Sequence, residues 1–445
     1  MLNLVDKKQT KNHNKLTFRQ INDFYIGNVQ GLIGLEYERL SLDKNTFENA
    51  NYEKLEKIIK EFSAINRWEL ILDNETVIGA ISDNGSSISL EPGCQLEISL
   101  APKKDIIEIE IELFKIINKI DKIAALYDVI FLGYGISPKS CVDDIELLNK
   151  RRYKIMNDFL PMCQYGEFIP RMMRQSAGIQ INVDYSDNID AYYKLKFFNL
   201  IMPFVSALLS NSPFENGKLS DKKSIRNNVW RFCGRNRCNL FYKNIFNKTF
   251  AKKNVFKNYI SCILDVPMIY IERNNEIIEI RGEITFREFM KKGYMGYFAT
   301  FEDYILHQSL CFPDVRLKKY IEIRNHDSSD PKIALALCAL YKGLCRCDIL
   351  KLLSEFKFLK VYEIDNYAMS TITQGLDYSL TCNLNSWDVV QKIVNCAKDK
   401  LSTREIFYLD PIFEMLKLKE TRADLLIASK INNISLFKKY INSSF

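Results

Sequence analysis

Histidine is scarce in this sequence, and the residues that usually bind zinc are not grouped. The chain has 3 His and 12 Cys among 445 residues, and the cysteines follow no regular spacing. Cys345 and Cys347 are separated by one residue, whereas zinc-binding pairs usually have a gap of two to four. The sequence therefore excludes a recognisable zinc motif and a disulfide framework. With no sign of secretion, we expect the cysteines to be reduced thiols.

Long hydrophobic runs are also missing. The longest apolar stretch, Phe197 to Leu209, is interrupted by Asn199, Pro203 and Ser206 and is shorter than the ~20 residues that a membrane span requires. We interpret it as a buried helix. The N-terminal segment is polar and lacks the apolar core of a signal peptide. These absences predict a soluble, cytoplasmic protein with no membrane partner.

Glycine-rich phosphate loops of the Walker and dinucleotide types are absent as well. What the chain has instead is an ordinary globular composition, with 47% hydrophobic and 26% charged residues, from which a large core can be built. The formal net charge is +7 at pH 7. A mildly basic protein suits an anionic small molecule such as a nucleotide, and it is weak evidence for nucleic-acid binding.

Hydrophobic periodicity indicates an α+β fold. Two early segments have apolar residues at helical spacing, and four short strand-like runs lie between them. Strands clustered in this way predict a largely antiparallel sheet flanked by helices. The expected helices are 48–62 and 106–127; the expected strands are 68–72, 77–81, 88–91 and 95–100; and the expected regions are a tail at 1–16, a core at 17–330 and a helical region at 331–445 packed on the core.

Four strand-like segments place polar side chains two residues apart, so that each segment has one apolar and one polar face. For a single strand, a solvated sheet face is the simplest interpretation. Here the polar positions are rich in oxygen acceptors, and carboxylates gathered on one face repel one another unless a cation lies among them. The polar residues are Glu36 and Glu38; Gln95, Glu97 and Ser99; Gln180, Asn182 and Asp184; and Glu322 and Arg324.

Carboxylate and amide oxygens without a Cys or His cluster indicate a hard cation, Mg²⁺ or Mn²⁺. Mg²⁺ held by carboxylates usually bridges the oxygens of a polyphosphate. Glu91 adds a further acid, because it precedes the Pro92-Gly93 turn that leads back to Glu97. The polar faces therefore predict a site for a metal ion and a polyphosphate.

A basic stretch, residues 222–253, carries ten Lys or Arg, no acid and six interleaved aromatic side chains. Its cations have three interpretations, and the sequence leaves all three open. They bind nucleotide phosphates and a substrate carboxylate, for which the planar Arg group is suited; they bind nucleic acid beside stacking aromatics; or they belong to a solvated basic helix with an aromatic core face. A second charged cluster, 316–324, mixes Arg and Lys with Glu322.

Eight segments, taken in order, resemble the motifs of the plant and proteobacterial glutamate–cysteine ligases. The resemblance covers the chain from about Ile33 to Arg324. It implies a carboxylate–amine ligase related to glutamine synthetase, with a curved, mainly antiparallel sheet whose concave face holds ATP and Mg²⁺. The segments are IGLEYE, ISLEPGCQLEISLAP, RMMRQSAGIQINVDY, SNSPFENGK, SIRNNVW, DVPM, TFREFM and FPDVRLKKYIEIR.

The activity that the resemblance implies is the first step of glutathione synthesis. ATP, L-glutamate and L-cysteine would give γ-glutamylcysteine, ADP and phosphate through a γ-glutamyl phosphate. Arg324 would meet the transferring phosphoryl group, and Glu322 would hold a metal ion at the nucleotide. The expected metal ligands are Glu36, Glu38, Glu91, Glu97 and Glu322; the expected catalytic residues are Arg324, Glu322 and Arg226; and the expected substrate- or nucleotide-binding residues are Arg174, Gln180, Asn182, Arg226 and Lys318.

Three positions depart from the family pattern, namely Cys94 in the turn and Gln175 and Ser176 before a predicted strand. They leave a ligase with a different amine acceptor open as a second hypothesis. A catalytically silent, RNA-binding relative is a third, although such a relative need not retain the acids. We expect small-molecule substrates, no nucleic-acid partner, and a monomer or homodimer.

Overall fold

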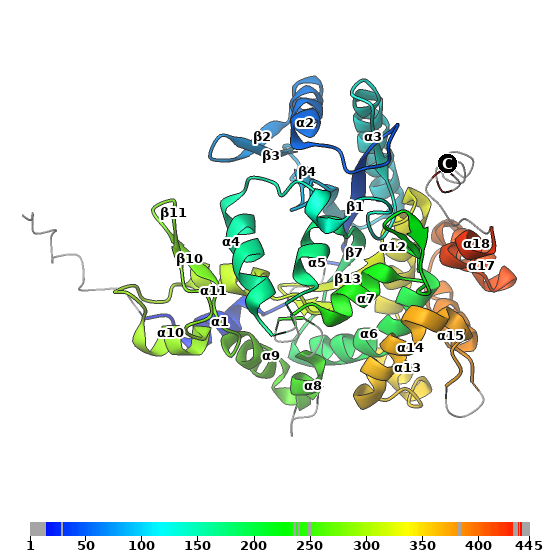
Figure 1. Cartoon of the computed structure of the whole chain (residues 1–445). Helices are drawn as coiled ribbons and strands as arrows, with labels where there is room; N and C mark the ends of the chain where they lie inside the picture. Colours follow the sequence, from blue (N-terminus) through cyan, green and yellow to red (C-terminus); the bar gives the residue numbers. More distant parts are fainter. Residues whose placement is uncertain are drawn as a thin grey trace, which may run out of the picture.

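The structure of the chain, a computed structural model, describes residues 15–27, 30–164, 166–234, 237–238, 241–246, 251–380, 384–429, 435 and 437. Its centre is an open antiparallel sheet surrounded by helices (Figure 1). The predicted α+β class with a mainly antiparallel sheet is confirmed. Most of the predicted tail, residues 1–16, lies outside the described residues.

In the described part of the chain, nine strands form the central sheet, and each pair of neighbours runs antiparallel. β1 lies in the middle, between β5 and β7, and its far end pairs with β6. Across the sheet the order is β12 (Val315–Leu317), β13 (Ile321–Asp327), β7 (Gly178–Val183), β1 (Ile33–Asp43), β5 (Leu96–Lys103), β4 (Ser87–Leu90), β3 (Thr76–Ile81) and β2 (Glu69–Asp73), with β6 (Val129–Leu132) beside β1.

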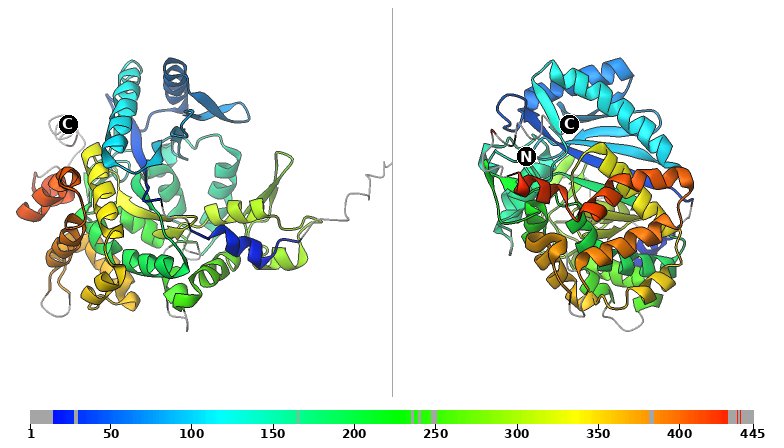
Figure 2. Two further views of the ribbon diagram at one scale, coloured as in Figure 1. Left: turned by 180° about the vertical axis from the view of Figure 1, so that it is seen from behind. Right: turned by 90° about the vertical axis from the view of Figure 1, so that its right-hand side faces the viewer.

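The central strands have an apolar face towards the core and a polar face on the opposite side. Leu35 of β1 and Ile179 of β7 are almost fully buried, whereas Glu36, between Leu35 and Tyr37, is partly exposed on the opposite face. α3 (Ile106–Ala125) packs on β5, and α12 (Pro331–Cys345) packs on β1 and β7. In the right-hand view of Figure 2, helices lie between the viewer and the sheet. The period of two in the sequence therefore corresponds to two real faces.

The other helices extend the core behind the sheet or stand in front of its polar face (Figures 1 and 2). α6 packs behind β13, while α4, α5 and α7 stand in front. The bounds are α1 (Phe18–Phe24), α2 (Tyr52–Asn66), α4 (Arg151–Phe159), α5 (Ile169–Gln175), α6 (Asn188–Leu208), α7 (Ile225–Phe232), α8 (Phe241–Phe246), α9 (Val255–Leu264), α10 (Phe286–Lys292) and α11 (Phe301–Ser309). Two small hairpins are β8 (Phe214–Glu215) with β9 (Lys218–Leu219), and β10 (Tyr270–Arg273) with β11 (Glu276–Glu279).

After α12 the described chain has no further strand and is mostly helical. α14 and α15 contact α6, and α15 and α17 contact α12. The bounds are α13 (Ile349–Glu355), α14 (Ile364–Gln374), α15 (Ser386–Lys398), α16 (Thr403–Ile406), α17 (Asp410–Leu418) and α18 (Arg422–Ala428).

Local signals account for the helix boundaries that differ from prediction. The helix predicted at 48–62 begins at Tyr52, because the Asn51 side chain caps it by accepting a hydrogen bond from the Lys54 N–H at 3.2 Å. The apolar run 197–209 forms the buried C-terminal half of α6 and the residue that caps it, as expected. Among the described residues, no helix combines the length and apolar character that crossing a membrane requires.

Candidate active site

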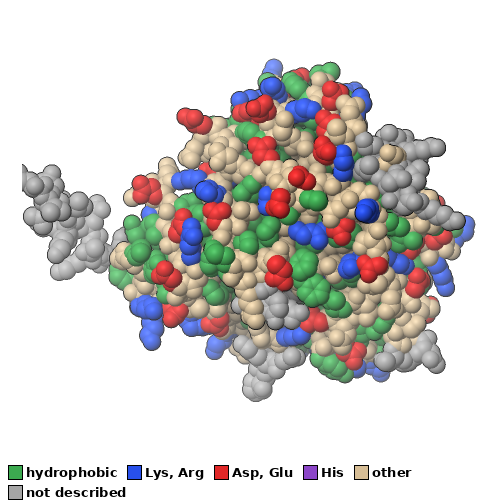
Figure 3. Space-filling model, viewed as in Figure 1, with side chains coloured by type: hydrophobic (Ala, Val, Ile, Leu, Met, Phe, Trp, Pro, Cys, Tyr) green, Lys and Arg blue, Asp and Glu red, His purple; other side chains and the backbone are tan. Residues whose placement is uncertain are grey.

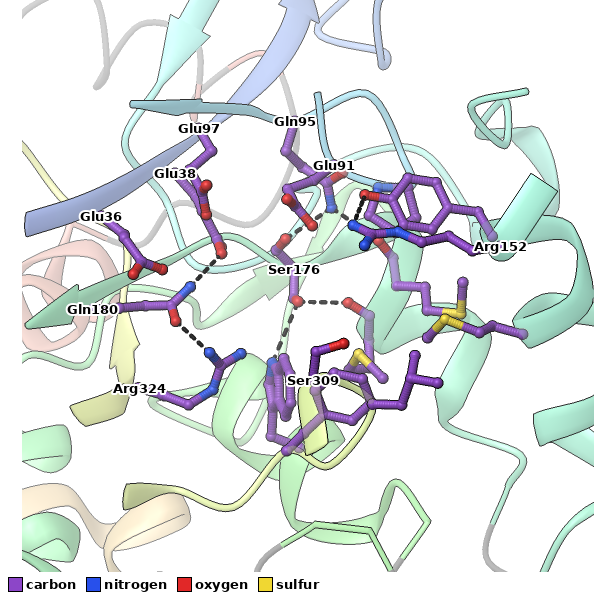
Figure 4. A pocket seen from close by; sticks show the side chains of 18 of the residues that line it. Glu36, Glu38, Glu91, Gln95, Glu97, Arg152, Ser176, Gln180, Ser309 and Arg324 are labelled. Carbon is purple, nitrogen blue, oxygen red and sulfur yellow. Dashed lines mark hydrogen bonds between the residues drawn. The ribbon is translucent and has the colours of Figure 1, made fainter. Parts of the chain in front are cut away.

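A pocket of about 240 Å³ opens on the polar face of the sheet, between the central strands and helices α4, α5 and α7 (Figure 4). Acidic and basic side chains come mainly from the strands, and apolar side chains come mainly from the helices. The lining residues are Glu36, Glu38, Glu91, Pro92, Gln95, Glu97, Arg152, Tyr153, Met156, Met172, Met173, Ser176, Gln180, Trp230, Ser309, Leu310, Phe312, Arg316 and Arg324.

Four of the five predicted metal ligands line this pocket. Glu38 of β1 and Glu97 of β5 are direct cross-strand partners, and Glu36 lies two residues before Glu38 on the same face. Glu91 reaches the pocket from the turn before β5, which is closed by hydrogen bonds between Glu91 and the residues that follow it. Like charges directly opposite each other destabilise a sheet, so this arrangement indicates a site for a compensating cation.

Strand β7 supplies amide donors to these carboxylates. Gln180 Nε2 donates to Glu38 Oε1 at 2.9 Å, and Asn182 Nδ2 donates to Glu36 Oε1 at 2.9 Å. The Gly178 backbone N–H donates to Glu38 Oε2 at 2.5 Å. These bonds orient the two acids without neutralising them, because an amide carries no net charge.

The environment of the acids favours their protonated forms. Burial and the charge of Glu91 together raise the pKa of Glu38 to about 7, although nearby arginines act in the opposite direction. Burial also raises the pKa of Glu97 well above its usual range, and the charges of Glu91, Glu36 and Glu38 add to this effect. A proton on either acid would compete directly with a bound metal ion.

The donor set fits a hard cation such as Mg²⁺ or Mn²⁺. Within the described ranges, no three His, Cys, Asp or Glu side chains converge closely enough to form a metal cage. Mg²⁺ seldom has such a cage, because it is usually held by one or two carboxylates, water and substrate phosphates. The raised pKa values of Glu38 and Glu97 come in part from neighbouring negative charges, which a divalent cation would neutralise.

Glu322, the fifth predicted metal ligand, lies beside the pocket at the centre of three cations. Its carboxylate accepts hydrogen bonds from Arg316 at 2.5 and 3.0 Å, from Lys318 Nζ at 2.7 Å and from Arg324 Nη1 at 2.8 Å. Complete burial opposes ionisation, but the three cations outweigh it and hold the pKa of Glu322 well below its usual range. In this arrangement Glu322 orients two arginines that line the pocket.

Arg324 connects this cationic cluster to the acidic strands. Its Nη1 also donates to Gln180 Oε1 at 2.5 Å, and Gln180 in turn donates to Glu38. The Nε of Arg324 is buried and has no hydrogen-bond partner among the described residues. Figure 4 shows the Arg324 guanidinium beside Gln180 at the lower edge of the pocket. An anion in the pocket would therefore find a cation already held in place.

Of the five predicted binding residues, Gln180 lines the pocket and the other four do not: Asn182 bonds to Glu36, Lys318 bonds to Glu322, and Arg226 and Arg174 lie farther out. Arg226 is 2% exposed, and its guanidinium packs against Gly178 at the start of β7. Its Nη2 donates to the backbone carbonyl of Arg324 at 3.3 Å, so it supports the two strands that carry Gln180 and Arg324. Arg174 donates to the carbonyl of Ile145 at 3.2 Å. The structure does not bring Arg174 to the pocket wall.

Sequence reasoning assigns no role to two arginines of the pocket. Arg316 of β12 is the cross-strand partner of Glu322, so a hairpin assignment for 315–327 would have found it. Arg152 of α4 donates from Nη2 to the Tyr153 hydroxyl at 3.3 Å, and its Nε has no hydrogen-bond partner in the described part of the chain. No local pattern marks Arg152, because it reaches the pocket from a helix.

In the basic stretch 222–253 the described arginines are buried, whereas Lys252 and Lys253 are exposed. In its described part, Arg231 pairs with Asp314 and Asp365, and Arg237 is 6% exposed. Among the described residues of the stretch, only Trp230 lines the pocket. On the face drawn in Figure 3, acidic and basic side chains are interspersed, without a broad basic surface. Arg235 and Lys248 lie outside the described residues. The described cations thus form neither the lining of a phosphate site nor an open nucleic-acid surface.

The three departures from the family pattern lie in different surroundings. Cys94 is fully buried in the turn, and Gln175 is 2% exposed; neither lines the pocket. Ser176 does line it: its hydroxyl donates to the Met172 carbonyl at 2.6 Å and accepts from Trp230 Nε1 at 3.3 Å. Of the three, Ser176 alone is placed to affect which substrate the pocket accepts.

Comparison with known proteins gives consistent matches. The model of the family described as Glutamate-cysteine ligase family 2 (GCS2) matches residues 32–353. The chloroplastic glutamate–cysteine ligase of Nicotiana tabacum is 29% identical over 404 residues, which cover 89% of this chain and 75% of that protein. The chloroplastic glutamate–cysteine ligase B of Oryza sativa subsp. japonica is 31% identical over 315 residues, which cover 70% of this chain and 62% of that protein.

Among solved structures, the chain resembles a glutamate–cysteine ligase from Francisella tularensis that was crystallised in complex with AMP. The TM-score is 0.56 at 13% sequence identity, and the match covers 89% of this chain and 84% of that chain. Identity this low shows a common fold. The plant relatives are named as chloroplastic, so the cytoplasmic location predicted for this chain stays a prediction.

Proposed function

Because the chain belongs to glutamate–cysteine ligase family 2 and is a ligase, we propose that it joins the γ-carboxylate of L-glutamate to the amine of L-cysteine in a reaction that depends on ATP and Mg²⁺. The products are γ-glutamylcysteine, ADP and phosphate, in the first step of glutathione biosynthesis. One observation carries the proposal: a single pocket combines four carboxylates with Arg316 and Arg324.

The chemistry explains why both kinds of side chain are needed. A carboxylate does not react with an amine, because its oxygen is a poor leaving group. In the first step a γ-carboxylate oxygen of glutamate attacks the γ-phosphorus of ATP, and ADP leaves. In the second step the amine nitrogen attacks the carbonyl carbon of the γ-glutamyl phosphate, and phosphate and a proton are released. The first step brings anions together, so positive charge must be supplied.

Mg²⁺, with each ion held by one or two of Glu36, Glu38, Glu91 and Glu97, would supply part of that charge. Arg324 supplies the rest at the transferring phosphoryl group. It is suited to this role because Glu322 and Gln180 already fix its guanidinium, and a fixed cation needs no reorganisation during the reaction. Arg316, held by Glu322 on the neighbouring strand, adds positive charge at the same edge of the pocket.

We assign the binding of a substrate α-carboxylate to Arg152, in place of Arg174. Arg152 lines the pocket, and its buried Nε has no hydrogen-bond partner among the described residues. A planar guanidinium binds a carboxylate through two parallel hydrogen bonds. Arg152 lies on α4, across the pocket from Arg324 (Figure 4), so the two cations can hold opposite ends of an amino acid.

Product analysis tests the proposal. The protein is incubated with ATP, Mg²⁺, glutamate and a mixture of all amino acids, and the peptide product is identified by mass spectrometry. Phosphate release is followed in parallel with glutamate, with and without cysteine. We expect γ-glutamylcysteine and a release of phosphate that cysteine stimulates. If another amine stimulates release and cysteine does not, the acceptor is wrong; if no amine does, the ligase activity itself is contradicted.

The oligomeric state and the cellular location are also expectations. We expect a monomer or homodimer that needs only small-molecule substrates, and we expect it to act in the cytoplasm. The buried and ion-paired cations of residues 222–253 argue against the RNA-binding alternative.

A further inference from the structure

Phe437 lies well beyond the pocket residues in the sequence, yet it is buried against segments that lead to the pocket. Its exposed fraction is 0%. Its ring stacks on the ring of Phe214, with 5.0 Å between the ring centroids and 11° between the ring planes. The rings of Tyr134 and Phe47 are T-shaped to it, with centroid distances of 5.2 and 6.4 Å. We call Phe47, Tyr134 and Phe214 the aromatic box, which Phe437 closes.

The aromatic box joins three segments that are far apart in the chain. Phe47 follows β1, Tyr134 follows β6 and Phe214 begins β8. The Phe214 N–H donates to the Tyr134 hydroxyl at 2.8 Å, which connects two of these segments directly. Phe47 has a φ of 62°, a conformation that is unfavourable for a bulky residue and persists only where the surrounding packing holds it. Phe437 therefore packs against all three segments at once.

The segment 134–137 connects the aromatic box to the pocket, because it runs antiparallel beside residues 175–177. Ile136 lies opposite Ser176, and Ser176 lines the pocket. Residues 175–177 lead directly into β7, which carries Gln180. A shift of segment 134–137 would therefore move one wall of the pocket and the start of β7. The backbone hydrogen bonds between the two segments run from the Ser137 N–H to the Gln175 carbonyl at 2.8 Å and from the Ala177 N–H to the Gly135 carbonyl at 3.0 Å.

A second connection runs through β8. Glu215 follows Phe214 in this strand and forms an ion pair with Arg171 of α5. Met172 and Met173, the next two residues of α5, line the pocket. The aromatic box is thus connected to the pocket in two ways, by backbone pairing and by an ion pair.

We propose that Phe437 is a positioning residue for the ligase reaction: by closing the aromatic box, it holds segment 134–137, and through that segment Ser176 and the start of β7, in the active arrangement. This inference rests on the proposed function. Large buried rings contribute much of the packing energy of a core, so the loss of this ring should loosen the segments that it joins. A displacement of about 1 Å at a pocket wall can lower turnover ~100-fold, even when the altered residue is distant.

Hydrogen exchange measured by mass spectrometry tests this connection in the full-length protein without any substrate. In Phe437→Ala we expect exchange about tenfold faster in peptides that cover 134–137 and 175–180, because their paired N–H groups open more often. Peptides that cover 69–81, at the β2 edge of the sheet, should exchange as in the wild type. Phe437→Leu keeps part of the buried volume and should give a smaller increase in the same peptides.

The matched control is Phe356→Ala. Phe356 is also 0% exposed and lies against two aromatic rings, those of Phe197 and Phe358, but it belongs neither to the pocket lining nor to the aromatic box. In Phe437→Ala we expect kcat to fall about tenfold or more, with the KM for ATP changed less than about twofold, because Arg324 lies on another strand. Phe356→Ala should keep the wild-type kcat below its melting temperature.

Unchanged exchange at 134–137 and 175–180 in Phe437→Ala, or a kcat equal to that of Phe356→Ala, overturns the inference and leaves the ligase activity intact. If Phe437→Ala does not fold, Phe437→Leu and Phe356→Leu are compared in the same way and judged by the same peptides and the same constants. Absence of turnover in the wild type with every amine overturns the proposed function. The role of Phe437 in the reaction then falls with it, while faster exchange would still show that Phe437 holds the segments beside the pocket.

Discussion

Glu38 of β1 lies directly opposite Glu97 of β5 in the antiparallel register. Two carboxylates at such a position are unfavourable in an ordinary sheet, and burial adds to the cost of ionising them. The pair is explained if this part of the sheet binds a cation, because the cation would offset the repulsion between the two carboxylates. The stability of the metal-free sheet is then lower than it could be. Several expectations about pH, metal ions and neighbouring residues depend on this relationship.

Removing one carboxylate of the pair should stabilise the metal-free protein. The folded-state pKa values of Glu38 and Glu97 lie above those of an unfolded chain, so the folded state loses stability as pH rises from the unfolded value through the folded one. For Glu38 that window runs from about 4.5 to about 7. We expect Glu97→Gln to raise the melting temperature by a few degrees at pH 8 and much less at pH 5. Glu276→Gln, at an exposed position of β11, is the control; equal shifts in both variants would contradict the idea.

Binding of Mg²⁺ to the free enzyme should strengthen as pH rises towards 7. Below that pH, Glu38 binds a proton, because burial and the charge of Glu91 raise its pKa to about 7, and the proton competes with the metal. Isothermal titration with Mg²⁺ alone should show a loss of affinity of up to about tenfold per pH unit below 7. In Glu38→Gln the affinity should be weaker and should depend less on pH, because one of the two competing protons is lost while that on Glu97 remains. A wild-type affinity that is constant between pH 6 and 8 would remove Glu38 from the metal site.

Glu322 and Glu36 should respond differently to the same substitution. Glu322→Gln removes the charge that holds Arg316, Lys318 and Arg324, and breaking such a buried cluster typically costs about 3–5 kcal/mol. We expect loss of ADP formation together with a lower melting temperature. Glu36→Gln should abolish ADP formation and leave the melting temperature unchanged or higher. A fully active Glu36→Gln enzyme would exclude Glu36 from the metal site.

Arg324→Lys should reduce turnover more than it weakens ATP binding. Lysine keeps the charge but cannot contact Gln180, Glu322 and a phosphoryl group with one planar group. We expect kcat to fall about 100-fold, as when one donor to a developing charge is removed, with a smaller change in the KM for ATP. Arg404→Lys, at an exposed position in α16, should have no effect. Equal changes in kcat and KM would argue for simple binding.

Arg152 and its neighbour Arg151 offer a matched comparison. Arg152 lines the pocket. Arg151 lies outside the pocket, and its Nε is 3.7 Å from Asp73 Oδ1. We expect Arg152→Met to raise the KM for glutamate or for the acceptor by roughly 10- to 100-fold, the value of losing a charged hydrogen bond. Arg151→Met should leave both constants close to those of the wild type. Similar losses in the two variants would contradict the assignment of a carboxylate to Arg152.

Several features of the site could be predicted because they depend on neighbouring residues in the chain. The alternation of Glu36 and Glu38 with Leu35 and Tyr37 identifies a strand with one polar face. The Pro92-Gly93 turn identifies the bend that brings Glu91 back towards Glu97. The hydrophobic pattern of 106–127 likewise predicts α3, which ends at Ala125.

Other features depend on contacts between distant segments. Glu322 shows the same alternation as Glu36, yet the structure surrounds it with three cations instead of exposing it to the pocket. Arg226 and Arg231 belong to a stretch that is strongly basic in sequence, yet they are 2% and 7% exposed. Neither outcome follows from local composition. The groups that contact a carboxylate or a guanidinium depend on how elements that are far apart in the chain pack together.

By itself, the sequence determined which face of each strand is polar and that the polar faces carry acids, because side-chain alternation is a property of the extended backbone. Only the tertiary structure decided that Glu38 meets Glu97, that Arg152 of α4 and Met172 and Met173 of α5 complete the pocket, and that Ser176 accepts a hydrogen bond from Trp230. Strand register and helix placement are set by the burial of the whole core, to which residues across the entire chain contribute.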